Sequence, residues 1–148
     1  MGAAAGSRIG EVLPHEAWDI LQNDPAARLI DVRSRAEWSF VGVPVLPGAP
    51  DPIFVEWATF PGMTPNAAFA LEVVEALDGA VPSKLCFLCR SGTRSMRAAH
   101  AVAEIFDREG KPVECLNVAE GFEGDLDEDR KRGGLNGWKA RGLAWQQS

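Results

Sequence analysis

The residues of this sequence best suited to chemistry are one cysteine and the arginines that follow it. In LCRSGTRSMRAAH (88–100), Cys89 ends an apolar run, and arginines occupy positions 90, 94 and 97. The RSGTR segment is expected to form a tight loop before a helix, with Gly92 allowing its N–H groups to turn inward. N–H donors and a helix N-terminus stabilise negative charge, and such surroundings favour a cysteine thiolate. We therefore predict that Cys89 is a nucleophile at neutral pH and faces a site for an anionic substrate.

The other two cysteines have a simpler interpretation. Cys86 and Cys115 lie inside predicted apolar strands, where cysteine usually serves as a small buried hydrophobic residue. Cys86 and Cys89 form a C-x-x-C pair, but side chains alternate along a strand, so Cys86 points away from the loop. A redox pair would need both cysteines at the helix N-terminus. A zinc site needs about four ligands, and the two histidines, His15 and His100, lie in predicted helices. We therefore expect no metal and no cofactor.

The elements that must position this loop alternate between helices and strands. Helical patterns start at Pro14 and span 35–40, 64–77 and 93–110. In the third of these, Thr64 is the candidate N-cap and Pro65 the first helical residue. Apolar strands are predicted at 29–32, 83–89 and 111–118, and a strand or loop at 53–60. This alternation indicates a parallel sheet covered on both faces, and ligands of such sheets bind outside the carboxyl ends of the strands, where Cys89 lies.

Length, composition and charge limit the possible functions. The chain has 148 residues, of which 46% are hydrophobic and 24% charged, as in one globular domain. Its net charge of -6 argues against a general binder of nucleic acids or anionic membranes. No apolar run reaches the roughly 20 residues of a membrane span, and the N-terminus lacks a secretory pattern. We therefore expect free thiols in a reducing cytoplasm.

Three segments together carry a family resemblance. CRSGTRS (89–95) follows an apolar strand, LIDVRSRAEW (29–38) precedes it, and NVAEGFEG (117–124) follows. On these segments the chain resembles the rhodaneses, the thiosulfate sulfurtransferase family, over residues 10–127. The resemblance implies an α/β fold, a doubly wound parallel sheet of about five strands with helices on both faces. We accordingly expect a flexible N-terminus (1–9), a rhodanese domain (10–127) and a C-terminal tail packed on the domain (128–148).

One segment departs from the family pattern. Family members often carry GHIPGA after DVR, whereas this chain has GVPVLPGA (42–49), which is longer and lacks the histidine. The departure concerns one wall of the pocket and not the nucleophile. Trp57 and Phe60 are interpreted as core residues rather than as pocket lining.

The resemblance also implies a mechanism. The Cys89 thiolate attacks the outer sulfur of thiosulfate, sulfite leaves, and the persulfide passes its sulfur to cyanide or a thiol, with a protein as another donor or acceptor. Arg90 and Arg94 would hold the anion and stabilise charge on the sulfite. The loop N–H groups would hold the persulfide. The substrate-binding candidates are Arg90, Ser91, Gly92, Thr93, Arg94 and Ser95, whereas Arg97 is equally well a solvated helix residue.

Charged residues at the end of the 29–32 strand and just after it are interpreted as supporting the site. Asp31 is expected to brace the active loop by accepting hydrogen bonds from its N–H groups or arginines. Arg33 is expected to form an ion pair with Glu37 on the following turn.

Two other functions are compatible with these residues. Phosphatases and arsenate reductases also use a cysteine loop with a terminal arginine, but tyrosine phosphatases place five residues between the two. Here four residues, RSGT, separate Cys89 from Arg94, and the smaller cup suits a sulfane sulfur. A non-catalytic rhodanese-like module often lacks the cysteine, which this chain retains with both arginines. A role as a sulfur carrier to a protein partner stays open.

Overall fold

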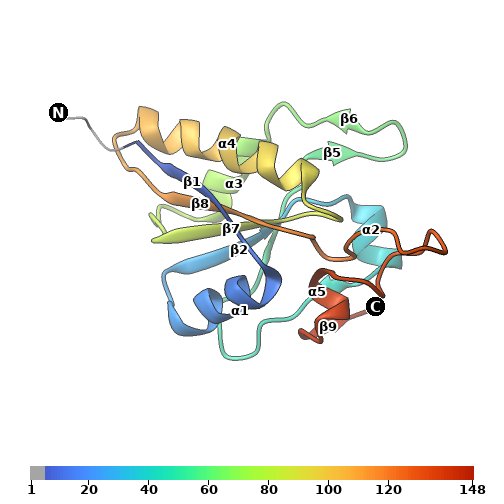
Figure 1. Cartoon of the computed structure of the whole chain (residues 1–148). Helices are drawn as coiled ribbons and strands as arrows, with labels where there is room; N and C mark the ends of the chain where they lie inside the picture. Colours follow the sequence, from blue (N-terminus) through green and yellow to red (C-terminus); the bar gives the residue numbers. More distant parts are fainter. Residues whose placement is uncertain (1–5) are drawn as a thin grey trace.

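Five parallel strands form the centre of the molecule (Figure 1). The computed structural model describes residues 6–148. The strands are β1 (Arg8–Val12), β2 (Ala27–Asp31), β4 (Ile53–Phe54), β7 (Lys84–Leu88) and β8 (Glu114–Val118), in the order β1-β8-β7-β2-β4. In the central strand β7, Cys86 pairs with Leu29 of β2 on one side and with Leu116 of β8 on the other. A central strand is buried on both faces, which explains why the β7 sequence is a continuous apolar run.

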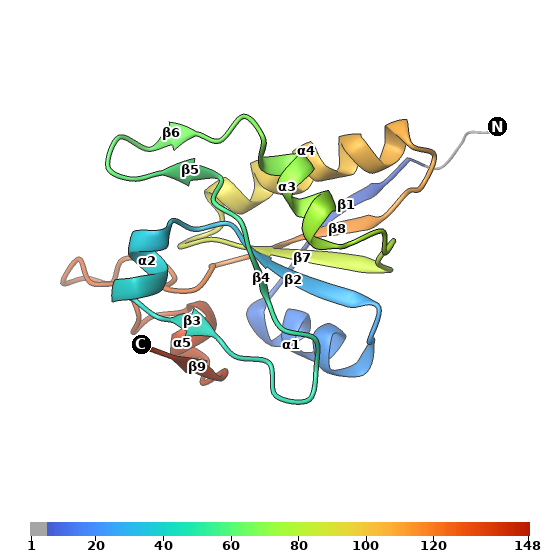
Figure 2. The same cartoon turned by 180° about the vertical axis from the view of Figure 1, so that it is seen from behind.

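Helices cover both faces of this sheet, as Figures 1 and 2 show from opposite sides. One face carries α3 (Phe69–Ala76) and α4 (Thr93–Arg108), and the other carries α1 (Pro14–Asn23) and α5 (Gly137–Ala140). Successive β7 side chains alternate between the two cores, with Leu85 and Phe87 in the first and Cys86 and Leu88 in the second. The predicted α/β fold, a doubly wound parallel sheet with helices on both faces, is confirmed.

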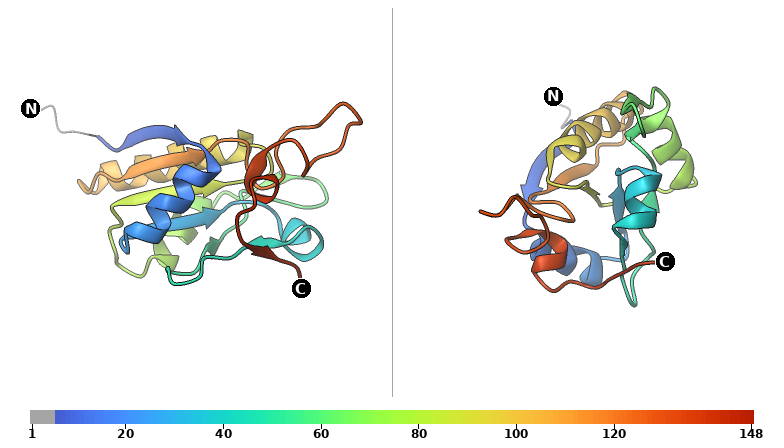
Figure 3. Two further views of the ribbon diagram at one scale, coloured as in Figure 1. Left: turned by 60° about the horizontal axis from the view of Figure 1, so that its bottom comes forward. Right: turned by 90° about the vertical axis from the view of Figure 1, so that its right-hand side faces the viewer.

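Short elements gather at the carboxyl ends of the strands, the end that faces the viewer in the right panel of Figure 3. The helix α2 (Arg35–Phe40) follows β2, and its N-cap Ser34 accepts a hydrogen bond from the Glu37 N–H at 3.3 Å. Two small antiparallel sheets flank this end: β5 (Ala58–Thr59) with β6 (Thr64–Pro65), and β3 (Val43–Pro44) with β9 (Trp145–Gln146). The loop after β7 lies among these elements.

The largest differences between predicted and observed boundaries lie at the N-terminus and at the start of the third predicted helix. The strand β1 begins at Arg8, inside the segment 1–9 predicted to be flexible, because it pairs with β8 from its first residue. Residues 1–5 of that segment lie outside the described residues. The helix predicted over 64–77 begins only at Phe69, since Thr64 and Pro65 belong to β6. The N-cap of α3 is Ala68, so no side chain caps this helix; the side chain of Asn66 instead accepts a hydrogen bond from the Ala68 N–H at 3.1 Å in the turn before it.

The C-terminal segment returns to the face of the sheet that carries α1. Trp138 is fully buried, and its Nε1 donates a hydrogen bond to the Ala144 carbonyl at 2.8 Å. Its ring meets Trp18 of α1 edge-on, with centroids 5.8 Å apart. Trp138 therefore anchors this segment, whereas Trp145 is 38% exposed. Within residues 6–148, none of the helices combines the length and the hydropathy of a membrane span.

Candidate active site

Cys89 lies where the chain leaves β7 and turns into α4. The residue is only 1% exposed, and its Sγ accepts a hydrogen bond from the Gly92 backbone N–H at 3.1 Å. The hydroxyl oxygen of Ser95 lies 3.2 Å from the same sulfur. Gly92 is the N-cap of α4 and has a φ of +110°, a conformation that side chains rarely adopt. The structure thus brings a backbone N–H group, a hydroxyl group and a helix N-terminus to one sulfur atom.

The segment after β8 supports this loop from behind. The N–H of Phe122 donates to the Cys89 carbonyl at 2.8 Å, and the N–H of Glu123 donates to the Arg90 carbonyl at 3.0 Å. Gly121 approaches so closely that a Cβ there would lie 2.5 Å from the backbone of Arg90. Sequence reasoning gave these residues no role in the site; the glycine of AEGF was the available signal, because a close backbone approach is one reason for a glycine.

Arg94 is bound to a carboxylate rather than open to solvent. Its Nη1 donates to Glu37 Oε1 at 2.7 Å and its Nη2 to Oε2 at 2.9 Å. Burial disfavours the charged carboxylate, but the hydrogen bonds and charge of Arg94 outweigh it and lower the pKa of Glu37 to about 2. The expected ion pair between Arg33 and Glu37 is therefore wrong, since Glu37 pairs with Arg94 across two elements.

Arg33 instead pairs with Asp31, and both side chains are fully buried. Arg33 Nη2 lies 2.7 Å from Asp31 Oδ2 and also donates to the Gly42 carbonyl at 2.9 Å. The predicted hydrogen bonds from the active loop to Asp31 are not present among the described residues, because the backbone N–H and guanidinium of Arg33 occupy this carboxylate. The guanidinium carbon of Arg33 lies 4.1 Å from the Phe122 ring centroid. The pair thus reaches the loop indirectly, through the residue that bonds to the Cys89 carbonyl.

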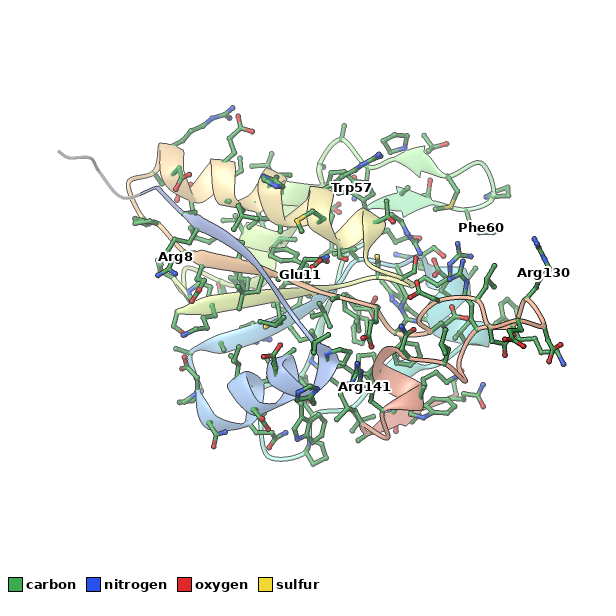
Figure 4. All side chains as sticks on the ribbon, viewed as in Figure 1. Arg8, Glu11, Trp57, Phe60, Arg130 and Arg141 are labelled. Carbon is green, nitrogen blue, oxygen red and sulfur yellow. The ribbon has the colours of Figure 1, made fainter. Side chains whose placement is uncertain are left out.

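A cavity of about 450 Å³ opens at the edge of the loop. Its lining comes from α2 and the residue after it, the β5–β6 hairpin, the loop, the first turn of α4 and the segment after β8: Glu37, Val41, Phe60, Met63, Arg90, Arg94 and Glu123. Phe60, labelled near the hairpin in Figure 4, is 59% exposed and lines this cavity, so its interpretation as a core residue is wrong. Trp57 meets Phe69 edge-on at 5.1 Å between centroids and packs on the core, as expected.

The remaining predicted residues divide by exposure. Ser95 is fully buried beside the sulfur, Ser91 is half-buried, and Arg90 and Thr93 are exposed. Arg97 is exposed on α4, which fits its interpretation as a solvated helix residue. The segment 42–49, which lacks the family histidine, places Val43 and Pro44 against β9 rather than in the cavity lining.

Cys86 and Cys115 are core residues. Both are fully buried, and burial raises the pKa of each thiol to about 12. Cys86 belongs to the core on the opposite face of the sheet from Cys89. Residues 6–148 hold no cluster of three histidine, cysteine, aspartate or glutamate side chains that could bind a metal ion.

Comparisons with known proteins place this site in a wider context. No family model matches the chain. Curated proteins from Rickettsia conorii (RC0915) and Rickettsia montanensis (encoded in the dnaA 5' region) are each 34% identical over 131 residues, covering 88% of this chain and 92% of theirs. The crystal structure of Rv0390 from M. tuberculosis is 42% identical with a TM-score of 0.81, covering 96% of this chain and 100% of that one.

A more distant structure shares the fold alone. The polysulfide-sulfur transferase of Wolinella succinogenes is 20% identical with a TM-score of 0.52, covering 99% of this chain and 83% of that one. Together with Rv0390, this likeness assigns the rhodanese-like fold to the present chain.

Proposed function

This chain belongs to the same protein family as Rv0390 and as the two Rickettsia proteins. On that premise we propose that it is a sulfurtransferase that works through a persulfide on Cys89. The proposal is carried by one observation: the Cys89 sulfur accepts a hydrogen bond from the Gly92 N–H at 3.1 Å, at the N-terminus of α4. That environment stabilises negative charge on sulfur. The Wolinella protein with the same fold is itself named a sulfur transferase.

The proposed reaction has two displacements at sulfur. The Cys89 thiolate attacks the outer sulfur of thiosulfate, the sulfur–sulfur bond breaks, and sulfite leaves with the bonding electron pair. The product is a Cys89 persulfide whose charge lies on the outer sulfur, within reach of the loop N–H groups. A thiolate or cyanide then attacks the outer sulfur, and Cys89 leaves as the thiolate. The first displacement forms the persulfide that the second consumes, and the second restores the thiolate that the first needs. This alternation predicts ping-pong kinetics.

The two arginines would have different roles in this reaction. Arg94 donates both of its Nη groups to Glu37, so its positive charge is already compensated. Arg90 is exposed at the cavity edge. We therefore assign contact with the leaving sulfite to Arg90, and the shape of the loop to the Arg94–Glu37 pair.

A protein is the second candidate for donor or acceptor. Phe60 and Met63 line the cavity beside the loop and are 59% and 38% exposed. Exposed apolar side chains beside the active loop suit a polypeptide better than a free inorganic anion. Under this alternative, the same Cys89 persulfide forms but thiosulfate loads it slowly.

Intact-mass spectrometry tests the proposal. Wild-type protein, Cys89→Ser and the control Cys86→Ala are measured before and after incubation with thiosulfate, and then after cyanide. We expect wild type and Cys86→Ala to gain one sulfur atom that cyanide removes, and Cys89→Ser to gain none. No gain from thiosulfate or from a persulfide donor would refute the function. Hydrolysis of an aryl phosphate that depends on Cys89 would favour a phosphatase instead.

A further inference from the structure

A series of hydrogen-bonded polar side chains leads from β1, at the edge of the sheet, to the Cys89 sulfur. Ser95, in the first turn of α4, has its Oγ 3.2 Å from Cys89 Sγ and 2.5 Å from Asn117 Oδ1. Asn117 lies on β8, only 2% exposed, and stands directly opposite Glu11 of β1 in the parallel pairing. Its Nδ2 donates to Glu11 Oε2 at 2.9 Å and to the Gly92 carbonyl at 3.1 Å. Glu11 is labelled on β1 in Figure 4.

The donors and acceptors in this series of side chains allow only one position for the Ser95 hydroxyl proton. The Asn117 amide has two N–H bonds, and both meet groups that can only accept, a carboxylate and a backbone carbonyl. The amide orientation is therefore fixed by its partners, with Oδ1 toward Ser95. Because Oδ1 can only accept, the single hydroxyl proton of Ser95 must go to Asn117. Ser95 then presents only lone pairs to Cys89.

We propose that Asn117 is a positioning residue that holds the Ser95 hydroxyl proton, so that Ser95 accepts a hydrogen bond from the Cys89 thiol in the resting protein. When Cys89 loses its proton, Ser95 can donate to the sulfur only by rotating away from Asn117, which leaves a buried carbonyl oxygen unpaired. An unpaired buried acceptor is costly. The arrangement therefore disfavours deprotonation of Cys89 in the resting protein, whereas the sequence predicts a thiolate there.

The cost falls on the thiolate and not on the persulfide. In a persulfide the inner sulfur carries neither a proton nor the charge, so the Ser95–Asn117 bond stays intact while the loop N–H groups bind the outer sulfur. This consequence for sulfur transfer rests on the proposed function, whereas the position of the proton does not. A resting thiol is also less open to alkylation and oxidation than a thiolate.

The charged groups around Cys89 come from the active loop and from two helices and two strands. They are Arg90 of the active loop, Arg94 of α4 with its partner Glu37 of α2, Asp31 of β2 with its partner Arg33, and Glu11 of β1 at the far end of the series of polar side chains. Substitutions of Ser95 and Asn117 leave all of these charges in place, so a change in Cys89 ionisation reports on the hydroxyl proton.

The test is a double-mutant cycle on the ionisation of Cys89. Ser95→Ala, Asn117→Ala and the double variant are titrated by the ultraviolet absorbance of the thiolate, with Cys89→Ser versions subtracted. Far-ultraviolet circular dichroism confirms that each variant is folded. Because the titration needs no sulfur donor, its outcome is independent of the mass-spectrometric test of function.

Asn117→Ala should free the Ser95 hydroxyl to donate to sulfur and lower the midpoint of the Cys89 titration by about one pH unit. Adding Ser95→Ala to that variant should bring the midpoint back up by a similar amount. Ser95→Ala alone should leave the midpoint unchanged or lower it, and this variant decides the question if Asn117→Ala does not fold. A rise with Ser95→Ala alone, or an unchanged or raised midpoint with Asn117→Ala, would overturn the proposal.

Discussion

Glu37→Gln should remove a pH-dependent part of the stability of this protein. The Glu37 and Arg94 side chains are 14% and 19% exposed, and burial opposes the charge on Glu37. The hydrogen bonds and charge of Arg94 nevertheless lower the pKa of Glu37 from 4.5 to about 2. Because the folded-state pKa is depressed, the stabilisation is fully present above the unfolded-state pKa and is lost as the pH falls toward 2. A difference of about 2.5 units corresponds to about 3 kcal/mol of unfolding free energy.

Urea denaturation of wild type and Glu37→Gln at about pH 6 and about pH 3 measures this loss. The advantage in unfolding free energy that wild type has over Glu37→Gln should shrink by about 2 kcal/mol between these pH values. The control is Glu104→Gln, which removes an exposed pair with Arg108. Its effect should stay below about 1 kcal/mol and change little with pH. If wild type and Glu37→Gln lose stability in parallel, the ion pair does not stabilise the charged carboxylate and the reasoning is refuted.

Three further predictions concern the loop and the cores. Gly121→Ala should reduce persulfide loading in protein that is still folded, because its Cβ would lie 2.5 Å from the Arg90 backbone; the control Gly133→Ala, also at positive φ but with open space, should load normally. Equal loading of the two would contradict this. Trp138→Ala should cost about 3–5 kcal/mol in urea denaturation, since the ring is fully buried; a loss under about 1 kcal/mol would show that the C-terminal segment is not anchored there. Mass mapping after iodoacetamide treatment at neutral pH should find Cys86 and Cys115 unmodified in folded protein, because burial raises both pKa values to about 12; rapid modification of either would refute their assignment to the core.

Much of the fold could be predicted because local patterns and burial agree. The apolar run of β7 and the helical pattern after it required a parallel sheet with covered faces, and that sheet places Cys89 at its carboxyl end. The hairpin at 58–65 was missed because Thr64 and Pro65 also fit a helix start. Local propensity predicts secondary structure poorly at such a segment, because its residues can pair with a nearby strand instead of starting a helix.

The sequence by itself identified Cys89 as the candidate nucleophile, and it predicted the glycine turn beside it and the alternation of strands and helices, because each depends on residues close together in the chain. The tertiary structure alone decided the partners of the charged and polar groups. Glu37 could have met Arg33 but meets Arg94, and Asn117 reaches Ser95 only because β8 pairs with β7 in one register. Such contacts depend on how separate elements pack, and a charged side chain has several equally plausible partners until that packing is known.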